Sequence, residues 1–412
     1  MRRVVITGIG VVSPVGSDLE TFWNNLISGV SGIGLIKRFD TRDFGVKIGG
    51  EVIGFDVDAY VPKKEQRRMD VYAHYGLAAA QMAVENAGLD MNAEDPERVG
   101  VVVGSGIGGL QTLQAQHTAL VEKGPSRCSP FMIPQMISNM AAGLIAIRHN
   151  MKGPNYAAVS ACATAAHCIG DALRIVQRGD ADAMLAGGAE ASVCELAVAG
   201  FGNMKALSTR NEEPEKASRP FDAERDGFVV AEGAGVLLIE ELEHARRRNA
   251  HVYCEIGGMG LTCDAYHMTA PVESGEGAAR AMKLAVEDAG LNPDDVDYIN
   301  AHGTSTPLND KTETKAVKST FGKEKARKIM ISSSKSMTGH LLGAAAGIES
   351  AVCALAIERG VVPPTINQEV PDPECDLDYV PNTARETKVH VALNNSLGFG
   401  GHNACLLFKS VG

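Results

Sequence analysis

The segment VSACATAAH, Val159 to His167, places one cysteine, Cys162, among small residues at the predicted start of a helix. A thiol at a helix N-terminus lies near unpaired backbone N–H groups and the positive end of the helix dipole, which favour the thiolate and lower the thiol pKa. The same N–H groups can hold a developing oxyanion. We therefore expect Cys162 to be a nucleophile with a lowered pKa, although a lone cysteine is more often a small buried core residue.

Two histidines also lie in settings that allow close approach to a substrate. His302 lies in NAHGTSTP, directly after a predicted strand, and His340 lies in SSSKSMTGHLLG, where Lys335 precedes it by five residues. A histidine at such a position can donate a hydrogen bond to a substrate or transfer a proton. Taken singly, a histidine of this kind is more often structural, so a catalytic role requires that both rings lie close to Cys162.

A glycine motif offers a different chemistry. GSGIGG follows the apolar run VGVVV and matches the dinucleotide pattern G-x-G-x-x-G at Gly104, Gly106 and Gly109. The match lies about a hundred residues into the chain, and no clear strand with a ribose-binding acid follows it. Close backbone packing beside a pocket therefore explains the glycines better than a nucleotide-dependent oxidoreductase does.

A faint internal repeat indicates which elements bring these residues together. AVENAGL at Ala83–Leu89 returns as AVEDAGL at Ala285–Leu291, 202 residues later, and both read as a helix end closed by glycine. A weaker echo pairs the Arg-Gly dipeptides at 178–179 and 359–360, 181 residues apart. The second offset places Cys162 opposite Gly343, so two equivalent helix N-termini would meet and bring His340 near Cys162.

Strands and helices alternate along the chain, and the strands are apolar and β-branched, which predicts α/β layers with buried sheets. The repeat predicts two similar halves with a boundary near residues 241–252. We expect residues 1–245 to carry the cysteine and residues 246–412 to carry both histidines.

Composition limits the class of protein. The chain has 412 residues and a formal net charge of −11, so it exceeds one ordinary core and offers no general field for nucleic acid. Nine cysteines without C-x-x-C pairs or zinc-ligand spacing favour a reducing compartment and no metal site. No apolar stretch reaches the ~20 residues of a membrane span. The sequence therefore predicts a soluble, cytoplasmic protein that binds neither nucleic acid nor membrane.

The cysteine segment, NAHGTSTP, KSMTGHLLGAAAG and NNSLGFGGHNA together resemble the thiolase-fold condensing enzymes, and more closely the β-ketoacyl-acyl-carrier-protein synthases of type II fatty-acid synthesis. The resemblance runs in the family's order from RRVVITGIGVVSPVG to GFGGHNACLLF, nearly the whole chain. The run DAYHMT favours the type II synthase over its type I relative. The resemblance implies a thiolase-like α/β fold, with two duplicated βαβαβαββ halves in stacked α/β/α/β/α layers.

The same resemblance implies a decarboxylative condensation of an acyl thioester on Cys162 with malonyl-acyl-carrier-protein, in fatty-acid elongation. The products would be a 3-oxoacyl carrier protein and carbon dioxide, and no cofactor is needed. His302 and His340 would stabilise the enolate, and Lys335 would support both rings by charge and hydrogen bonding. The backbone N–H groups of Cys162 and Phe399 would form the oxyanion hole.

Other positions match the family's substrate contacts. Phe399, between Gly398 and Gly400, would gate the cysteine, although alone it could be a core aromatic in a flexible loop. Glu349 fits a buried structural carboxylate bonded to backbone. The resemblance assigns the acyl pocket and the phosphopantetheine arm to four further residues: Ile107, Phe201, Thr304 and Thr306. Threonines in such loops often only cap turns.

An acyl carrier protein is strongly acidic, so its docking needs a local basic patch on this acidic chain. The run KKEQRR supplies one, and a solvated helix face is the alternative. The resemblance assigns the docking surface to Lys64, Arg67, Arg68, Arg127 and Lys205. It also implies a homodimer in which the region Ser129–Met140 helps to form the neighbour's pocket.

Rival functions differ in the residues they need. A polyketide ketosynthase would use the same cysteine and histidines, whereas a non-catalytic partner subunit of the chain-length-factor kind commonly lacks the nucleophile. A thiolase that uses coenzyme A needs a second catalytic cysteine near the C-terminus, where GFGGHN has Phe399 and His402. A cysteine hydrolase needs a histidine oriented beside Cys162 in a triad, for which the sequence gives no signal.

Overall fold

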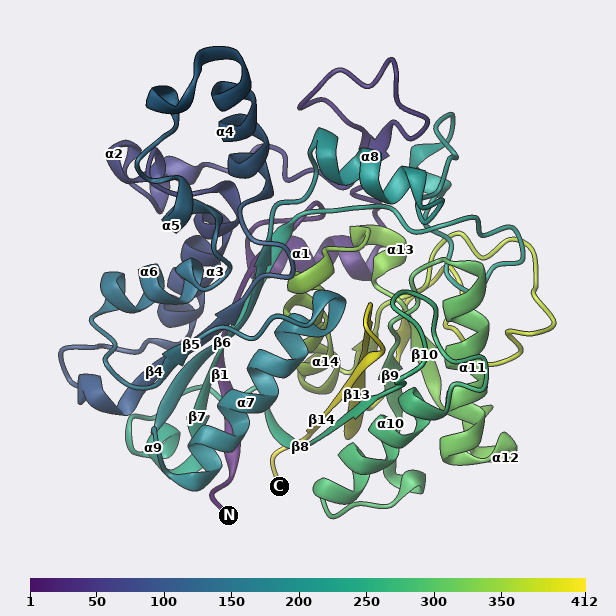
Figure 1. The fold of residues 1–412 in the computed structure, drawn as a ribbon. Coiled ribbons are helices and arrows are strands. Elements are labelled where there is room, and N and C mark those ends of the chain that lie inside the picture. The colour runs from purple at the N-terminus through teal and green to yellow at the C-terminus, as the bar shows by residue number, and fades with distance from the viewer.

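The computed structural model describes residues 1–412. Its main feature is a ten-stranded sheet built from strands along the whole chain (Figure 1). Its strands are β1 (Val4–Val12), β4 (Val99–Gly104), β5 (Asn155–Tyr156), β6 (Ala183–Glu190), β7 (Gly233–Glu241), β8 (Cys254–Cys263), β9 (Tyr298–Asn300), β10 (Met330–Ser332), β13 (Val391–Gly398) and β14 (His402–Lys409). Two small sheets pair β2 (Gly34–Leu35) with β3 (Ile48–Gly49), and β11 (Val361–Val362) with β12 (Arg385–Glu386).

The strand order of the large sheet is duplicated. From its middle outward it reads β1-β7-β6-β4-β5 on one side and β8-β14-β13-β9-β10 on the other. The two series also pair their strands in the same way. In each, the first two pairings are antiparallel and the last two, which lead to the edge strand, are parallel. Only two residue pairs, Val5–Glu255 and Ile6–Cys254, join β1 to β8.

The chain also forms fourteen α-helices. They are α1 (Leu19–Ile27), α2 (Lys63–Gln66), α3 (Val71–Ala87), α4 (Leu110–Lys123), α5 (Met132–Met136), α6 (Met140–His149), α7 (Thr164–Arg178), α8 (Glu195–Asn203), α9 (Leu242–Arg247), α10 (Glu276–Asp288), α11 (Pro307–Phe321), α12 (Lys323–Ala326), α13 (Lys335–Thr338) and α14 (Ala345–Arg359). None of them has both the length and the apolar content needed to cross a bilayer.

The helices define the layers. Helices α7 and α14 pack against each other in the centre, where the largest apolar cluster joins them to both strand series (Figure 1). A second cluster packs α3 and α6 on the outer face of the first series, and a third packs α10 and α11 on the outer face of the second. The result is the stacked α/β/α/β/α arrangement that the resemblance implied.

The two central helices begin in the same way. A 3₁₀ turn, Ala161–Ala163, leads into α7, and a second, Leu342–Ala344, leads into α14, so that the turns and helices lie 181 residues apart at every boundary. The first residue of each turn has a positive φ, 51° at Ala161 and 48° at Leu342. Both helices end at a left-handed glycine. The predicted correspondence between Cys162 and Gly343 is confirmed.

Candidate active site

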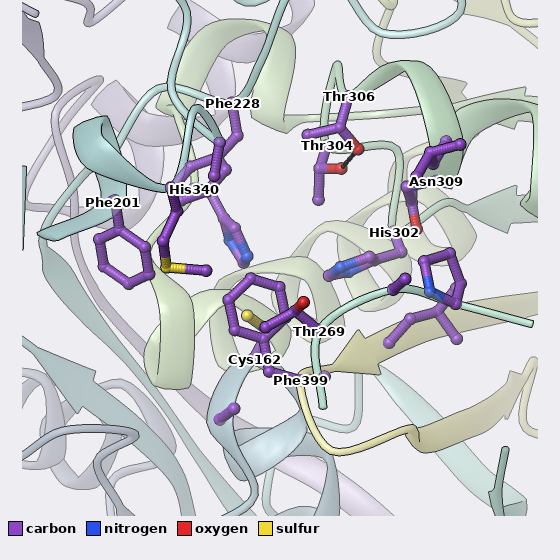
Figure 2. A pocket seen from close by; sticks show the side chains of 18 of the residues that line it. Cys162, Phe201, Phe228, Thr269, His302, Thr304, Thr306, Asn309, His340 and Phe399 are labelled. Atoms are coloured by element: carbon purple, nitrogen blue, oxygen red, sulfur yellow. Dashed lines mark hydrogen bonds between the residues drawn. The ribbon is translucent and has the colours of Figure 1, made fainter. Parts of the chain in front are cut away.

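One cavity of about 520 Å³ receives side chains from both strand series (Figure 2). Cys162 enters it from the turn before α7, His302 from the loop after β9, and His340 from the loop before α14. Figure 2 shows these three side chains pointing into the same space. The predicted proximity of His340 and Cys162 is therefore confirmed, and His302 joins them.

The Cys162 turn is held by a close backbone contact. A Cβ atom at Gly398 would lie 2.6 Å from the Ser160 carbonyl oxygen and 3.4 Å from the Cys162 nitrogen, so only glycine allows β13 to approach the turn this closely. This approach brings the backbone N–H of Phe399 close to Cys162, where it favours the thiolate and so lowers the thiol pKa. The position fits the implied oxyanion hole at Cys162 and Phe399.

The protonation of Cys162 differs from the sequence expectation. Burial raises the pKa of the thiol to about 12, although the Lys335 charge and the Phe399 N–H act in the opposite direction. The predicted lowering of the thiol pKa is wrong because the side chain is only 8% exposed, and the loss of water around a thiolate outweighs nearby positive charge. The Cys162 side chain is therefore a thiol at pH 7.

The two imidazole rings lie edge to face, with centroids 5.4 Å apart and planes at 84°. Burial, with the Lys335 charge, lowers the pKa of both His302 and His340 well below the ordinary value of 6.5. Both rings are therefore neutral at pH 7. Nδ1 of His340 accepts the Leu342 N–H at 3.3 Å, which leaves the proton on Nε2, an atom with no partner in the protein. His340 is thus a ready hydrogen-bond donor.

A buried carboxylate fixes the His302 loop. Glu313 on α11 accepts the backbone N–H groups of His302 and Gly303, both at 2.8 Å, and the side-chain amide of Asn395 at 3.1 Å. The three donors satisfy a carboxylate that is almost inaccessible to water. The sequence analysis did not identify Glu313, because an acidic residue on a helix gives no signal of the loop it contacts.

Lys335 and Glu349 form a buried ion pair beside the histidines. The prediction that Glu349 bonds to backbone is wrong, because its carboxylate binds the Lys335 ammonium and its second oxygen has no partner in the protein. Lys335 acts on both rings by charge, as expected. Its Nζ hydrogen bond goes to Glu349, not to an imidazole.

The other predicted cavity residues lie at the same site. Phe399 lines the cavity and precedes Gly400 and Gly401, whose φ angles of 90° and 75° are costly for other residues. Thr304 and Thr306 line it too, with their hydroxyl oxygens 2.9 Å apart. The remaining predicted lining residues are Ile107 and Phe201, and Phe201 packs edge to face on Phe228, which the sequence analysis missed.

Ile107 also lines a second cavity of about 460 Å³. The walls of this cavity are mainly apolar and come from α4, α5 and the segment after β5: Leu110, Leu113, Met136, Ile137, Ala157 and Val159. Ile107 therefore lies between the cavity that holds Cys162 and an apolar space beyond it. The glycines of the GSGIGG motif pack closely here, as expected, since a Cβ at Gly109 would lie 2.3 Å from the Gln135 carbonyl oxygen.

The five predicted docking residues are exposed, and none of them forms an ion pair. They lie on and after α2, on the 3₁₀ turn that follows α4, and directly after α8: Lys64, Arg67, Arg68, Arg127 and Lys205. Lys205 also lines the cavity that holds Cys162, and the Arg68 guanidinium lies 5.3 Å from the Phe131 ring centre. Uncompensated cations therefore lie both at the cavity and on the α2 surface.

The fold and the cavity define a thiolase-like α/β protein with one cysteine and two neutral histidines at a single site. Family models named "Beta-ketoacyl synthase, N-terminal domain" and "Beta-ketoacyl synthase, C-terminal domain" match residues 1–245 and 253–369. The chain belongs to the beta-ketoacyl synthase family.

Known proteins agree with this assignment over nearly the whole chain. The 3-oxoacyl-[acyl-carrier-protein] synthase 2 of Synechocystis sp. (strain PCC 6803) is 54% identical over 99% of this chain and 98% of its own. The protein of the same name from Staphylococcus aureus (strain COL) is 53% identical with the same coverage. Among solved structures, a chain of the complex described as a type II PKS acyl-carrier protein with its ketosynthase bound to the hexaketide aligns with this chain. The TM-score is 0.91, the identity is 36%, and both chains are fully covered.

Proposed function

We propose that this protein is a 3-oxoacyl-acyl-carrier-protein synthase, which lengthens an acyl chain by condensing it with malonyl-acyl-carrier-protein and releasing carbon dioxide. The observation that carries the proposal is the meeting of one thiol and two neutral imidazoles in one cavity. A neutral imidazole is a hydrogen-bond donor rather than a strong base, and decarboxylation needs no base to remove a C–H proton. Relatives that share about half of the residues carry this activity in their names.

In the first half-reaction Cys162 takes the acyl group from its carrier protein. The sulfur attacks the thioester carbonyl, the bond to the pantetheine sulfur breaks, and the thiol proton leaves with the departing pantetheine thiol. The N–H groups of Cys162 and Phe399 stabilise the tetrahedral oxyanion, which forms in a site with little water. Because burial raises the pKa of Cys162, the attack couples proton loss to bond formation.

In the second half-reaction malonyl-acyl-carrier-protein occupies the same cavity. Hydrogen bonds from His302 and His340 hold its thioester oxygen while the carboxylate leaves as carbon dioxide. The resulting enolate carbon attacks the acyl carbonyl on Cys162 and displaces the cysteine sulfur as a thiolate, which takes up a proton from water and returns Cys162 to the thiol. Burial, together with the Lys335 charge, keeps both imidazoles neutral, so each has one N–H to donate.

Delivery of both substrates uses the phosphopantetheine arm of the carrier protein. Thr304 and Thr306 place two hydroxyl groups along the cavity wall, and Lys205 lies at the same cavity. The cations that follow α2 and α4 form the docking surface for the acidic carrier protein, which their charge steers and orients. The solved ketosynthase complex with an acyl-carrier protein supports this choice of partner.

A second copy of the chain completes the acyl pocket in this proposal. Strand β5 is the edge of the large sheet, so its free backbone groups can pair with a partner strand. Large apolar side chains are exposed around it and on α4 to α6: Leu113, Phe131, Ile133, Ile137, Ile147, Tyr156 and Val159. A patch of this kind marks a protein interface, and its Ser129–Met140 part borders the apolar cavity beyond Ile107.

All nine cysteines are free, which fits a reducing cytoplasm.

Polyketide chain extension is the second candidate, because the ketosynthase of the solved complex shares 36% of its residues with this chain. The fatty-acid synthases named above share 53–54%, which favours fatty-acid elongation. Cys162 argues against the chain-length-factor alternative.

The test is to incubate the purified protein with an acyl carrier protein loaded with a saturated chain, and then to add malonyl-acyl-carrier-protein. Intact-protein mass spectrometry is expected to show one acyl group on Cys162, and the carrier protein to return two carbons longer with a 3-oxo group. An acyl group on another residue, or release of the free acid, would overturn the proposal.

A further inference from the structure

A third buried carboxylate, Glu190, contacts the cavity walls without entering the reaction. It is the last residue of β6 and has no measurable exposure to solvent. Its sequence context, AMLAGGAE, ends an otherwise apolar strand with an acid. Its charge contributes to raising the pKa of Cys162, and no lysine, arginine or histidine forms an ion pair with it.

Glu190 accepts four hydrogen bonds, two on each oxygen. Oε1 accepts the Ser105 hydroxyl at 2.8 Å and the Ile107 N–H at 3.4 Å. Oε2 accepts the Gly106 N–H at 2.8 Å and the Gly343 N–H at 3.1 Å. The four accepted bonds favour the ionised carboxylate, against burial, which raises the pKa of Glu190 to about 7. The low-dielectric surroundings strengthen each of these bonds.

These four donors belong to two loops from different halves of the chain. Ser105, Gly106 and Ile107 follow β4, whereas Gly343 lies in the turn before α14, three residues after His340. The loops touch, since a Cβ atom at Gly343 would lie 2.2 Å from the Gly106 nitrogen. Glu190 therefore ties the loop that carries Ile107 to the rigid turn that follows His340.

The tie holds the loop that carries Ile107, the one side chain shared by the walls of both cavities. Ile107 lines both the cavity with Cys162 and the apolar cavity beyond, so a long acyl chain on Cys162 reaches the second space only when Ile107 moves. A short acyl group fits beside Cys162 and needs no such movement. The cost of displacing the Ile107 backbone is set largely by the hydrogen bonds that hold its loop.

We propose that Glu190 is a positioning residue that holds Ile107 between the two cavities and so sets the acyl-chain length that Cys162 accepts. This inference rests on the proposed function. Glu190 itself touches no substrate atom and acts through the loop that it anchors.

The decisive variant is Glu190→Gln, which keeps the size of the side chain but replaces one acceptor oxygen with an NH₂ donor. Each oxygen of Glu190 accepts two hydrogen bonds, so the NH₂ group that replaces one oxygen faces two other donors. Both hydrogen bonds on that side are therefore lost. The initial rate at which Cys162 is acylated is measured by intact-protein mass spectrometry, with butyryl- and with dodecanoyl-acyl-carrier-protein. We expect the dodecanoyl-to-butyryl rate ratio to rise by about tenfold, because the gate opens more easily.

Glu313→Gln is the matched control, since Glu313 is also a buried carboxylate that holds backbone N–H groups, here those of His302 and Gly303. It is expected to leave the dodecanoyl-to-butyryl ratio within twofold of wild type. If Glu190→Gln fails to fold, Glu190→Asp is measured in the same way, because its shorter carboxylate cannot reach both loops and must also raise the ratio.

A double variant tests whether Glu190 acts through Ile107. In an Ile107→Ala background the gate is already absent, so adding Glu190→Gln is expected to change the ratio by less than twofold. An unchanged ratio in the folded single variant, or an equal effect in the Ile107→Ala background, would overturn the inference. A wild-type protein that forms no acyl adduct with either chain would instead overturn the proposed function.

Discussion

The turn that carries Cys162 and the turn that carries Gly343 share a backbone but differ in what they hold. Each has a positive φ at its first residue and leads into a 15-residue helix that ends at a left-handed glycine. The first places the Cys162 thiol in the cavity. The second has glycine at the matching position, Gly343, whose backbone N–H binds Glu190, while the neighbouring Leu342 side chain lines the cavity. The two helix N-termini are therefore equivalent in backbone, and in the proposed function one carries the nucleophile while the other supports a neighbouring loop.

The missing side chain in the second turn is a requirement of packing. A Cβ atom at Gly343 would lie 2.2 Å from the Gly106 nitrogen and 2.8 Å from a carboxylate oxygen of Glu190. Glycine at position 343 thus leaves room for the loop with Ile107 to pack against this turn. The turn with Cys162 has no such packing on the side of the sulfur, because that side faces the cavity.

Removing the sulfur makes the first turn chemically equivalent to the second. We expect Cys162→Ala to reduce condensation by at least about 10³-fold, because the covalent intermediate can no longer form. Product formation from acyl- and malonyl-acyl-carrier-protein measures the loss. The thermal midpoint serves as the control, and an unchanged midpoint with full activity would contradict the role of the thiol.

A side chain added at position 343 tests whether the second turn requires glycine for packing. Gly343→Ala is expected to destabilise the protein by about 1–3 kcal/mol, since the new methyl group meets backbone that cannot move freely. Denaturant unfolding measures the change. Gly200→Ala is the matched control, because Gly200 lies on α8 with no atom near its Cβ position and the change favours the helix. Equal effects of the two variants would refute the packing argument.

Charge reversal on the docking surface separates substrate delivery from the chemistry of the turns. We expect Lys64→Glu, Arg67→Glu and Arg68→Glu together to raise the KM for acyl-carrier-protein by about tenfold, with kcat and small thioester analogues little affected. The effect should shrink as salt is added, because exposed charges are screened. Lys63 already pairs with Asp58 at 3.0 Å, so Lys63→Glu is the milder control. Equal losses with the carrier protein and the analogue would argue against docking at these residues.

Sequence patterns predicted the features that depend on spacing along the chain. The 181-residue offset matched Cys162 to Gly343, and the strand-end position of His302 brought it to the cavity. Features that depend on burial were missed or wrong. The pKa of Cys162 is raised because the cavity excludes water, which no local pattern records.

Partners of buried carboxylates were also hidden from the sequence. Glu349 binds Lys335, one helical element away, and not the backbone that the prediction assigned to it. Glu190 binds a loop 84 residues earlier in the chain, and Glu313 binds a loop 11 residues earlier. The acid at the end of the apolar strand AMLAGGAE was the one signal that could have drawn attention to Glu190.

The central claim is that the sulfur first takes the acyl group and that the imidazoles, from the opposite half, then activate the malonyl thioester in the same cavity. It is tested most directly by following Cys162 in the His340→Ala variant by intact-protein mass spectrometry, first with acyl- and then with malonyl-acyl-carrier-protein. The acyl adduct should form at close to the wild-type level and then persist, with release slowed about 10²–10³-fold, because enolate formation has lost a hydrogen-bond donor. Prompt disappearance of the adduct with wild-type formation of the 3-oxoacyl product would contradict the account.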